Sequence, residues 1–416
     1  MSSKICSDFV TQACEEYCVR VADGTHGSPK ETSDGKQLVT SKNVKGGRLS
    51  LESAYFISLD DFHIINKRSK VDQWDLLLTM IGTVGEVCLV DQPKPDFAIK
   101  NVGLLKCGDE LRGKWLYYFL RSPQGQGLIE QRKKGSTQQY ISLTEIRKLP
   151  ISYPRSSEDM KAALDTLWSL DDRITLLRET NDTLETIAQA LFKSWFVDFE
   201  PVRAKAEGLE PEGMDAATAA LFPDSFEESE QGLIPRGWKV RKVEDVMELF
   251  YGKALKATER VDGPIPVYGS GGITGYHNES IVKGPSVIVG RKGNVGSLFW
   301  EDRSFFPIDT VFYVRTDNPL TYCYYLLQTL GLEDMNTDAA VPGLNRNNAY
   351  RLPVVVATTL ILESFDEIIS SLRNKMFSNS QHAQKLTQLR DTLLPRLISG
   401  QLRLPEAQEL FEEACA

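Results

Sequence analysis

The sequence predicts an α+β protein with two similar globular heads in tandem, each followed by a long helix. Three observations predict this fold class. Stretches about 205 residues apart carry the same order of elements, an amphipathic helical pattern follows each stretch, and an acidic, proline-bearing segment separates the halves. We expect the helices to pack as an antiparallel, coiled-coil-like spacer with pseudo-twofold symmetry, because neither can bury so long an apolar stripe alone.

The internal repeat is the strongest of these signals. Four segments recur in the same order: MIGTVGEVCLV (80–90) with RKGNVGSLFW (291–300), FAIKNVGLL (97–105) with FPIDTVFYV (306–314), WLYYFL (115–120) with YCYYLL (322–327), and LPISYP (149–154) with LPVVVA (352–357). In the first pair, Gly82 and Gly85 align with Gly293 and Gly296. The repeat therefore predicts one scaffold built twice.

Within each head the pattern is mixed. The β-branched and apolar runs at 286–290, 298–300 and 310–314 predict strands, whereas 115–122 and 320–330 predict helices. The tyrosines that recur in these helices are expected to pack in the core. We place the boundaries as follows: first head 1–154, first spacer helix 155–200, acidic linker 201–235, second head 236–356, second spacer helix 357–400 and C-terminal tail 401–416.

The two long helices show apolar seams with three- and four-residue steps. The seam residues are Leu164, Leu167, Ile174, Leu177, Leu184, Leu191 and Trp195 in the first helix, and Phe365, Ile369, Leu372, Met376, Ala383, Leu386 and Leu393 in the second. Asn181 and Asn379 interrupt them. Either they fix the register of the pair, or they are partly exposed polar residues at helix ends.

Composition narrows the function classes. No apolar run is long enough to span a membrane and the N-terminus does not look like a signal peptide, so we expect a cytoplasmic protein. The seven cysteines contain no CxxC pair, and we expect Cys14 and Cys18 to be reduced thiols rather than zinc ligands. The net charge of −9 conceals an asymmetry: residues 36–156 carry +7 and residues 157–235 carry −12. A basic head is compatible with phosphate contacts.

Two heads on a rigid spacer suit a target with two separated patches, and double-stranded DNA is such a target. Because the heads share a scaffold but differ in most side chains, each is expected to read a different short sequence. The target would then be asymmetric and bipartite.

The chain resembles the specificity subunits of type I restriction-modification systems. The resemblance rests on LFKSWFVDFEPVRAKAEG (191–208), LRDTLLPRLISGQL (389–402), DGTHGSPKETSDGKQLVTSKNVKGG (23–47), GSTQQYISL (135–143), YGSGGITGYHN (268–278), VGRKGNVGSLFW (289–300) and AAVPGLNRN (339–347). The first two are similar to the family's two conserved regions, and the others to its target-recognition domains.

This resemblance implies a bacterial or archaeal DNA-recognition subunit that does no chemistry and binds no cofactor itself. It implies a complex with two methyltransferase subunits, which bring S-adenosylmethionine, and in the full enzyme two restriction subunits that use ATP and magnesium.

Polar and basic loop residues are the candidates for contacts with phosphates or base edges, since arginine can fork onto guanine and asparagine or glutamine onto adenine. The candidate DNA-binding residues are His26, Lys36, Ser41, Lys42, Asn43, Lys45, Arg132, Lys133, Lys134, Ser136, Thr137, Gln138, Gln139, Tyr268, Ser270, His277, Arg291, Lys292, Asn294, Asn345, Arg346 and Asn347. The candidates for docking the methylating subunit are Lys193, Trp195, Phe196, Asp198 and Glu200. An equally good interpretation is that Trp195 and Phe199 pack onto the second helix.

Two alternatives remain. A stand-alone methyltransferase or nuclease is disfavoured because the only Asn-Pro, Asn318-Pro319, is followed by Leu320 instead of proline and an aromatic residue, and because no GxxxxGK[ST] loop occurs. The Gly269–Gly275 cluster is not framed as a strand that leads into a helix. The other alternative is a coiled-coil scaffold whose heads bind only proteins.

Overall fold

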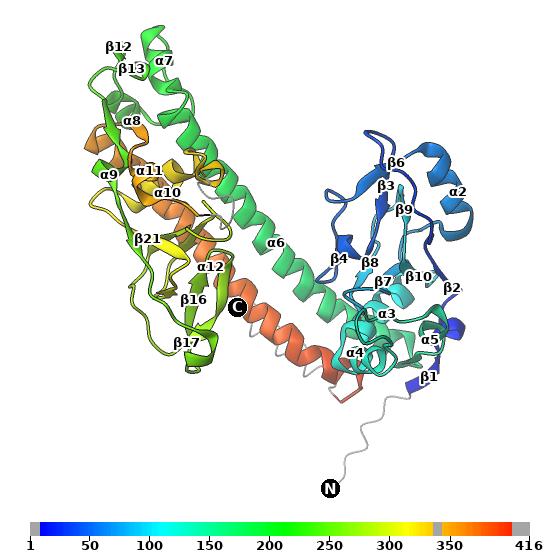
Figure 1. The fold of residues 1–416 in the computed structure, drawn as a ribbon. Helices are drawn as coiled ribbons and strands as arrows, with labels where there is room; N and C mark the ends of the chain where they lie inside the picture. The colour runs from blue at the N-terminus through cyan, green and yellow to red at the C-terminus, as the bar shows by residue number, and fades with distance from the viewer. Residues whose placement is uncertain (1–8, 336–342, 402–416) are drawn as a thin grey trace. The chain divides into compact units, whose positions relative to one another are not determined.

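The computed structural model describes residues 9–335 and 343–401, which fall into two compact units (Figure 1). The first unit combines the chain up to Leu176 with the chain from His382 onward, and the second is Leu177–Gln381. Each unit therefore contains one head and a part of each long helix. These units divide both long helices, whereas the predicted boundaries give each helix a segment of its own.

Head 1 (Phe9–Pro154) alternates short strands with short helices. Its elements are β1 (Phe9–Ala13), α1 (Cys14–Tyr17), β2 (Arg20–Asp23), β3 (Lys36–Val39), the 3-10 helix η1 (Ser41–Asn43), β4 (Val44–Lys45), β5 (Arg48–Leu49), β6 (Tyr55–Ile57), α2 (Leu59–Ser69), β7 (Leu76–Thr79), β8 (Val87–Leu89), β9 (Phe97–Ile99), β10 (Val102–Lys106), α3 (Glu110–Arg121), α4 (Pro123–Glu130), α5 (Leu143–Arg147) and β11 (Pro150–Pro154). The long helix α6 (Ser157–Phe196) follows.

Head 2 (Lys239–Val356) has the same plan with fewer helices. Its elements are β14 (Lys239–Lys242), α9 (Val243–Val246), β15 (Glu248–Tyr251), η2 (Ala257–Glu259), β16 (Ile265–Gly269), β17 (Gly272–His277), β18 (Ser286–Gly290), β19 (Leu298–Glu301), β20 (Phe306–Pro307), β21 (Val311–Arg315), α10 (Leu320–Gln328), η3 (Leu332–Asp334), α11 (Arg346–Tyr350) and β22 (Pro353–Val356). The second long helix, α12 (Thr359–Ile398), follows.

The sheets confirm that one scaffold is built twice. The four-stranded sheet has the order β2-β10-β7-β8 in head 1 and β15-β21-β18-β19 in head 2. Each head also has a three-stranded sheet with one antiparallel and one parallel pairing, β6-β3-β9 and β17-β16-β20. A two-stranded sheet, β1-β11 or β14-β22, joins the start of each head to its last strand.

The repeated glycine turn has the same backbone geometry in both heads. Gly82 and Gly85 lie between β7 and β8 with φ of 80° and 101°, and Gly293 and Gly296 lie between β18 and β19 with φ of 84° and 73°. Left-handed backbone of this kind strains any residue with a Cβ atom. The aligned glycines therefore build the same turn in each head, and Gly269–Gly275 belongs to the β16-β17 hairpin.

The predicted antiparallel pairing of the long helices is confirmed in each unit. In the second unit, Asn181 and Glu185 of α6 contact α12 at Asn379 and Arg373, so residue numbers fall along one helix as they rise along the other. In the first unit, Asp171 of α6 binds Arg390 of α12. The seam is buried at residues such as Leu167, Phe365 and Leu386.

The two asparagines fix register; they do not lie at helix ends. Asn379 is buried, and its Nδ2 donates to Asn181 Oδ1 at 2.9 Å. Asn181 Nδ2 in turn donates to the carbonyl of Met376 at 3.0 Å and to Ser380 Oγ at 2.9 Å. A buried amide that finds partners at only one register penalises a slipped helix pair, in which those groups would be unpaired.

The segment predicted as a linker, 201–235, is folded. It contains α7 (Glu200–Ala206), α8 (Ala216–Leu221) and the hairpin of β12 (Phe226–Ser229) and β13 (Gly232–Pro235). Phe222 is buried and its ring lies 5.0 Å from that of Trp195 in an edge-to-face arrangement. This segment thus closes over the end of α6, and its acidic side chains remain on its outer side, as at Glu227 and Glu228.

The asparagine pair gives a first prediction. Asn379→Ala removes the donor to Asn181 Oδ1, so the second unit should lose about 1–3 kcal/mol in free energy of unfolding, measured by urea denaturation of the full chain. Thr183→Ala is the control, since the Thr183 hydroxyl is exposed and bonds only along its own helix, to the Glu179 carbonyl. Equal stability of the two variants would contradict a register-fixing role.

Candidate nucleic-acid interface

Three loops meet on one surface of head 1. The first loop (40–47) follows β3, the glycine loop (80–86) joins β7 to β8, and the polar loop (131–142) follows α4. Gly46 N donates to Glu86 Oε2 at 2.8 Å, which ties the first loop to the glycine loop. Ile81 forms a β-bridge with Tyr140, which ties the glycine loop to the polar loop. The sequence predicted polar residues in the first and the third loop, and the structure brings these loops together through the glycine turn.

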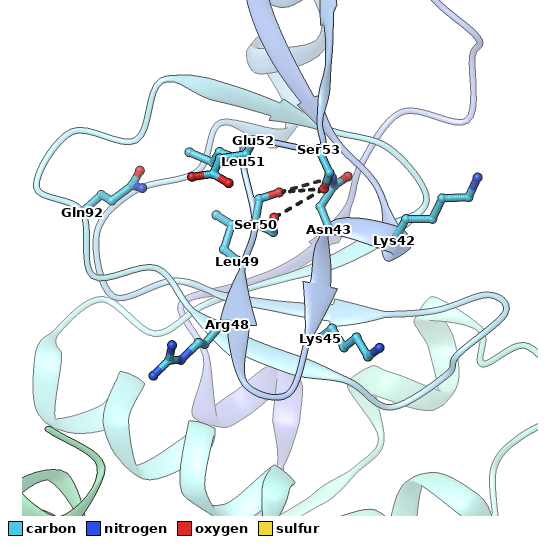
Figure 2. A pocket seen from close by; sticks show the side chains of 10 residues that line it. All are labelled: Lys42, Asn43, Lys45, Arg48, Leu49, Ser50, Leu51, Glu52, Ser53 and Gln92. Carbon is cyan, nitrogen blue, oxygen red and sulfur yellow. Dashed lines mark hydrogen bonds between the residues drawn. The ribbon is translucent and has the colours of Figure 1, made fainter. Parts of the chain in front are cut away.

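The first loop of head 1 lines an open pocket of about 580 Å³ (Figure 2). Lys42, Lys45 and Arg48 supply three exposed cations around it, and Ser50 and Gln92 add polar groups. Figure 2 shows Lys45 and Arg48 projecting from the two strands of the β4-β5 hairpin and Lys42 projecting from η1. Such a concentration of positive charge on a loop suits contacts with phosphate groups.

Asn43 has a structural role in this pocket instead of the predicted direct contact. It is 3% exposed, its Oδ1 accepts from Thr40 N at 2.8 Å, and its Nδ2 donates to Ser53 Oγ at 3.1 Å. Its amide thus holds η1 and the hairpin together. Ser41, beside it, is half-buried.

The polar loop of head 1 presents its middle to solvent. Ser136, Thr137, Gln138 and Gln139 are exposed, and Gly135, with φ of 92°, begins their turn. The basic residues before them are engaged locally: Arg132 Nη1 donates to the Leu128 carbonyl at 2.9 Å, Lys133 pairs with Glu130 at 2.5 Å and Lys134 with Glu145 at 3.4 Å. The exposed amide and hydroxyl residues can reach a ligand from this loop.

Two further candidates of head 1 lie outside this three-loop surface. The His26 ring lies 2.9 Å from Asp23 Oδ2 and 2.9 Å from Asn101 Oδ1, so both of its nitrogens are occupied. Lys36 is ion-paired with Asp96. Both side chains are accessible, but each already has a partner within the protein.

Head 2 builds the same surface from different side chains. The β16-β17 turn, the glycine loop (291–297) and the segment 343–347 meet there. Asn294 N donates to Ser270 Oγ at 3.3 Å, and Leu344 N donates to the Arg291 carbonyl at 2.8 Å. Lys292 forms a β-bridge with Gly343, as Ile81 does with Tyr140 in head 1.

The structure sharpens the prediction for 343–347. Asn345 caps α11, since its Oδ1 accepts from Asn347 N at 2.9 Å, and Arg346 is the first residue of that helix, so these residues begin a helix rather than form a turn. Arg346 and Arg291 both stack on Tyr251, at 4.9 and 4.7 Å from its ring centroid. Residues 339–342 of the quoted segment lie outside the described residues.

Two candidates in head 2 are buried. Tyr268 is 6% exposed and its hydroxyl donates to Glu301 Oε2 at 2.9 Å. His277 is 8% exposed, and its Nδ1 accepts from Val261 N at 3.1 Å. Each side chain therefore has a partner inside the head, and contact of either one with DNA stays a prediction.

Each head is anchored to the helix pair by a tyrosine, a carboxylate and an arginine. In the first unit, Tyr118 of α3 donates to Asp171 Oδ2 at 2.9 Å, and Asp171 Oδ1 binds Arg390 at 2.6 Å. Burial and the nearby Asp171 charge raise the pKa of Tyr118 far above its usual value, so the phenol stays protonated and donates.

The second unit repeats this anchor with Tyr325 of α10, Glu185 and Arg373. Tyr325 donates to Glu185 Oε2 at 3.1 Å, and Arg373 lies 3.6 Å from the same oxygen. The tyrosines that recur in the sequence therefore serve packing, as predicted, and also carry a polar contact to the helices.

The anchor of head 1 reaches the candidate surface. Arg121 of α3 lies near Asp171 and donates to the hydroxyl of Tyr117, which donates in turn to the carbonyl of Gly47 at 3.4 Å. Burial raises the pKa of Tyr117 to about 12. The hairpin that carries Lys45 and Arg48 is thus bonded, through two side chains of α3, to the helix pair.

Of the two residues in the packing alternative, Trp195 packs on α12, whereas the Phe199 ring contacts Phe226 and Trp238. Trp195 is 1% exposed and Phe196 is 6% exposed, and both contact Phe365 of α12. Lys193 is exposed and ion-paired with Asp198, which raises the Lys193 pKa. Glu200 is exposed. Only these charged residues remain available to a partner.

Sequence reasoning missed Arg48 and Tyr251. Arg48 follows the quoted segment 23–47 by one residue, so a wider reading of that basic loop would have included it. Tyr251 gives no local signal, since it ends an ordinary apolar strand, and its role depends on arginines 40 and 95 residues away. Arg291 and Arg346 themselves were predicted.

The described part of the chain was compared with the geometry of metal and thiol sites. Across residues 9–335 and 343–401, no group of three or more His, Cys, Asp or Glu side chains is arranged to hold a metal ion. Cys14 and Cys18 are buried free thiols with sulfurs 3.9 Å apart. Within the same residues, no helix has an apolar stretch that could cross a bilayer.

The glycine loop of head 2 gives a second prediction. A Cβ atom at Gly296 would lie 2.3 Å from Glu333 N, so Gly296→Ala should displace the loop and destabilise the second unit by about 2–4 kcal/mol, measured by urea denaturation. Gly293→Ala is the matched control, because it has a similar φ but meets only the Ser270 hydroxyl, at 3.1 Å. It should cost about 1 kcal/mol. If both variants were equally stable, the backbone contact would not hold the loop.

Known proteins are similar to this chain in sequence and in fold. The family model described as "Type I restriction modification DNA specificity domain" matches residues 44–186 and 235–352, one match for each head. The HindI specificity subunit of Haemophilus influenzae is 27% identical over 340 residues, which cover 66% of this chain and 73% of that protein. The MjaIX specificity subunit of Methanocaldococcus jannaschii is 24% identical over 80% of this chain and 78% of its own length.

A solved structure agrees at the level of the fold. The S subunit of a type I restriction-modification system from M. genitalium superimposes with a TM-score of 0.55 at 20% identity, over 94% of this chain and 96% of that one. The family model covers more than half of the sequence and matches each head once. The chain therefore belongs to the type I restriction-modification DNA specificity family, as a non-catalytic DNA-recognition subunit.

Proposed function

We propose that this chain recognises an asymmetric, bipartite DNA site, with one half-site for the three-loop surface of each head. One observation carries the proposal: both heads assemble the same surface around the same glycine turn, from different side chains. A shared scaffold gives both heads the same way of approaching a duplex. Different loop residues give them different hydrogen-bonding groups to present to base edges.

The glycine loops illustrate this difference. Head 2 presents Arg291, Lys292 and Asn294 where head 1 has Met80, Ile81 and Thr83. In head 1 the polar groups lie instead on the neighbouring loops, with Gln138 and Gln139 exposed on one and Lys42 and Lys45 on the other. Because donors and acceptors stand at different places on the two surfaces, the half-sites they select should differ.

The same proposal includes the partners. Two copies of an adenine methyltransferase subunit would bind this chain and bring S-adenosylmethionine, and two restriction subunits would bring ATP and magnesium. The exposed Lys193 and Glu200 and the half-buried Asp198 at the end of α6 are the proposed contacts for a methyltransferase subunit, with the acidic segment that follows them. The complex would work in the cytoplasm of a bacterium or an archaeon.

Methylation of the host genome tests the proposed function. Co-expression of this chain with its methyltransferase partner should place methyladenine on both strands of one motif that is interrupted by unspecified bases, detected by methylation-sensitive sequencing. A strain without the gene for this chain is the control and should lack that motif. A single contiguous motif would contradict recognition by two heads.

Exchange of a head tests whether each reads its own half. Replacing residues 236–356 by the corresponding head of a relative should change one half of the methylated motif and leave the other half as it was. The reciprocal exchange of residues 1–154 should change only the other half. If either exchange altered both halves, the heads would not read DNA independently.

A further inference from the structure

We propose that Arg291, Arg346 and Tyr251 form a clamp for a DNA phosphodiester on head 2. This inference rests on the proposed function and deepens it, since it assigns these arginines to the DNA backbone and leaves base recognition to their neighbours. Tyr251 was not among the residues predicted from the sequence.

The clamp is preassembled from three separate segments of head 2. Tyr251 is the last residue of β15, an edge strand, and 46% of its side chain is exposed. The guanidinium of Arg291, from the glycine loop, lies 4.7 Å from the ring centroid, and that of Arg346, from α11, lies 4.9 Å from it. Stacking on an aromatic ring attracts a cation and orients its plane.

Backbone carbonyls fix the orientation of both arginines. Arg291 Nη1 donates to the carbonyl of Asp309 at 3.0 Å, and Arg346 Nη1 donates to the carbonyl of Leu249 at 3.3 Å. Each guanidinium carries five N–H donors, so several remain for a ligand. Binding of an anion would therefore cost little side-chain entropy, because the two arginines are already ordered.

The positive charges of Arg291 and Arg346 favour binding of an anion. Within residues 9–335 and 343–401, neither arginine forms a salt bridge. The hydrogen bond from Arg291 to Asp309 goes to the backbone carbonyl of Asp309 rather than to its carboxylate. The two guanidinium groups lie less than about 10 Å apart, since both lie on one ring, and this is near the screening length at ~0.1 M salt. Lys253, on the loop after Tyr251, is exposed and adds positive charge, whereas Lys256 on the same loop is paired with Glu259 at 3.5 Å.

At the same place in the scaffold, head 1 has an ion pair instead of the two stacked arginines. Tyr251 pairs with Phe312 across β15-β21, and Asp23 pairs with Gly103 across β2-β10, at aligned positions of the repeat. Asp23 binds Arg68 at 3.0 Å and the His26 ring at 2.9 Å. Head 1 therefore has a carboxylate where head 2 has an exposed ring that contacts two arginines.

A phosphodiester fits this site better than a base edge does. A phosphate oxygen is negatively charged and would offset the repulsion between the two neighbouring guanidinium groups. Guanine is neutral and would leave that repulsion uncompensated. Lys292 and Asn294 lie on the same glycine loop. Contacts to the backbone by the clamp would set the register in which these two residues meet the bases.

The test measures how DNA affinity depends on salt. The chain is assembled with its methyltransferase partner, and the Kd for a duplex with the target motif is determined at several salt concentrations for wild type, Arg291→Gln and Arg346→Gln. Each substitution should weaken binding and reduce the slope of log affinity against log salt by about 0.9. Base preference, measured with single-base variants of the duplex, should remain as in wild type.

Two further comparisons separate the clamp from a general charge effect. Arg68→Gln removes one positive charge from head 1, where Arg68 is already paired with Asp23, and should leave the slope unchanged. Tyr251→Phe keeps the ring and should bind as wild type, whereas Tyr251→Ala should lower affinity. If Tyr251→Ala fails to fold, the two arginine variants decide the question.

Two results would overturn the clamp. One is a salt slope in Arg291→Gln and Arg346→Gln equal to that of wild type. The other is loss of preference at a single base pair with an unchanged slope, because that result identifies the arginines as base readers. If wild type itself showed no sequence preference, the proposed function would fail, and the slopes would still decide the clamp.

Discussion

The polar contact between each head and the helix pair is the constraint on which the other features depend. In both units a carboxylate of α6 accepts from a tyrosine of the head and pairs with an arginine of α12, Asp171 with Arg390 and Glu185 with Arg373. Each contact bonds three chain segments at once, and each acidic side chain is mostly buried. Loss of one member leaves a desolvated charge without its partner, which is far more costly than loss of an exposed ion pair. The packing of each head on the helices is therefore specific as well as apolar.

Each head combines a common scaffold with its own set of loop side chains. The sheet order, the positive φ of the aligned glycines and the bridge between the glycine loop and the last loop are shared. The side chains on the loops are not. Head 1 gathers lysines around an open pocket and exposes glutamines, whereas head 2 stacks two arginines on one tyrosine. Variation confined to the loops changes what is bound without disturbing the fold, which is the usual division of work between scaffold and loop.

Much of this fold could be predicted from sequence because duplication and periodicity are local signals. The glycine turns, the strands at 286–290 and 298–300 and both long helices follow from spacing alone. The candidate site was harder to predict from the sequence than the fold. Asn43, Tyr268 and His277 are polar residues in glycine-rich segments, yet each turns inward to satisfy buried groups, and no local pattern distinguishes that from exposure. Tyr251 also gives no local signal, because its partners come from the distant glycine loop and from α11. In the segment 201–235, an acidic composition gave no sign of the folded hairpin or of the buried Phe222.

The central claim is that each three-loop surface touches its own part of a DNA site. Photo-crosslinking measures this most directly: a photoreactive amino acid is placed at the exposed Ser136 of head 1 or Asn345 of head 2, in the chain assembled with its partner on the target duplex. Crosslinks from the two positions should map to opposite halves of the motif and should be lost from a half whose sequence is scrambled. Crosslinks from both positions to the same half, or none from either while the complex stays bound, would contradict it.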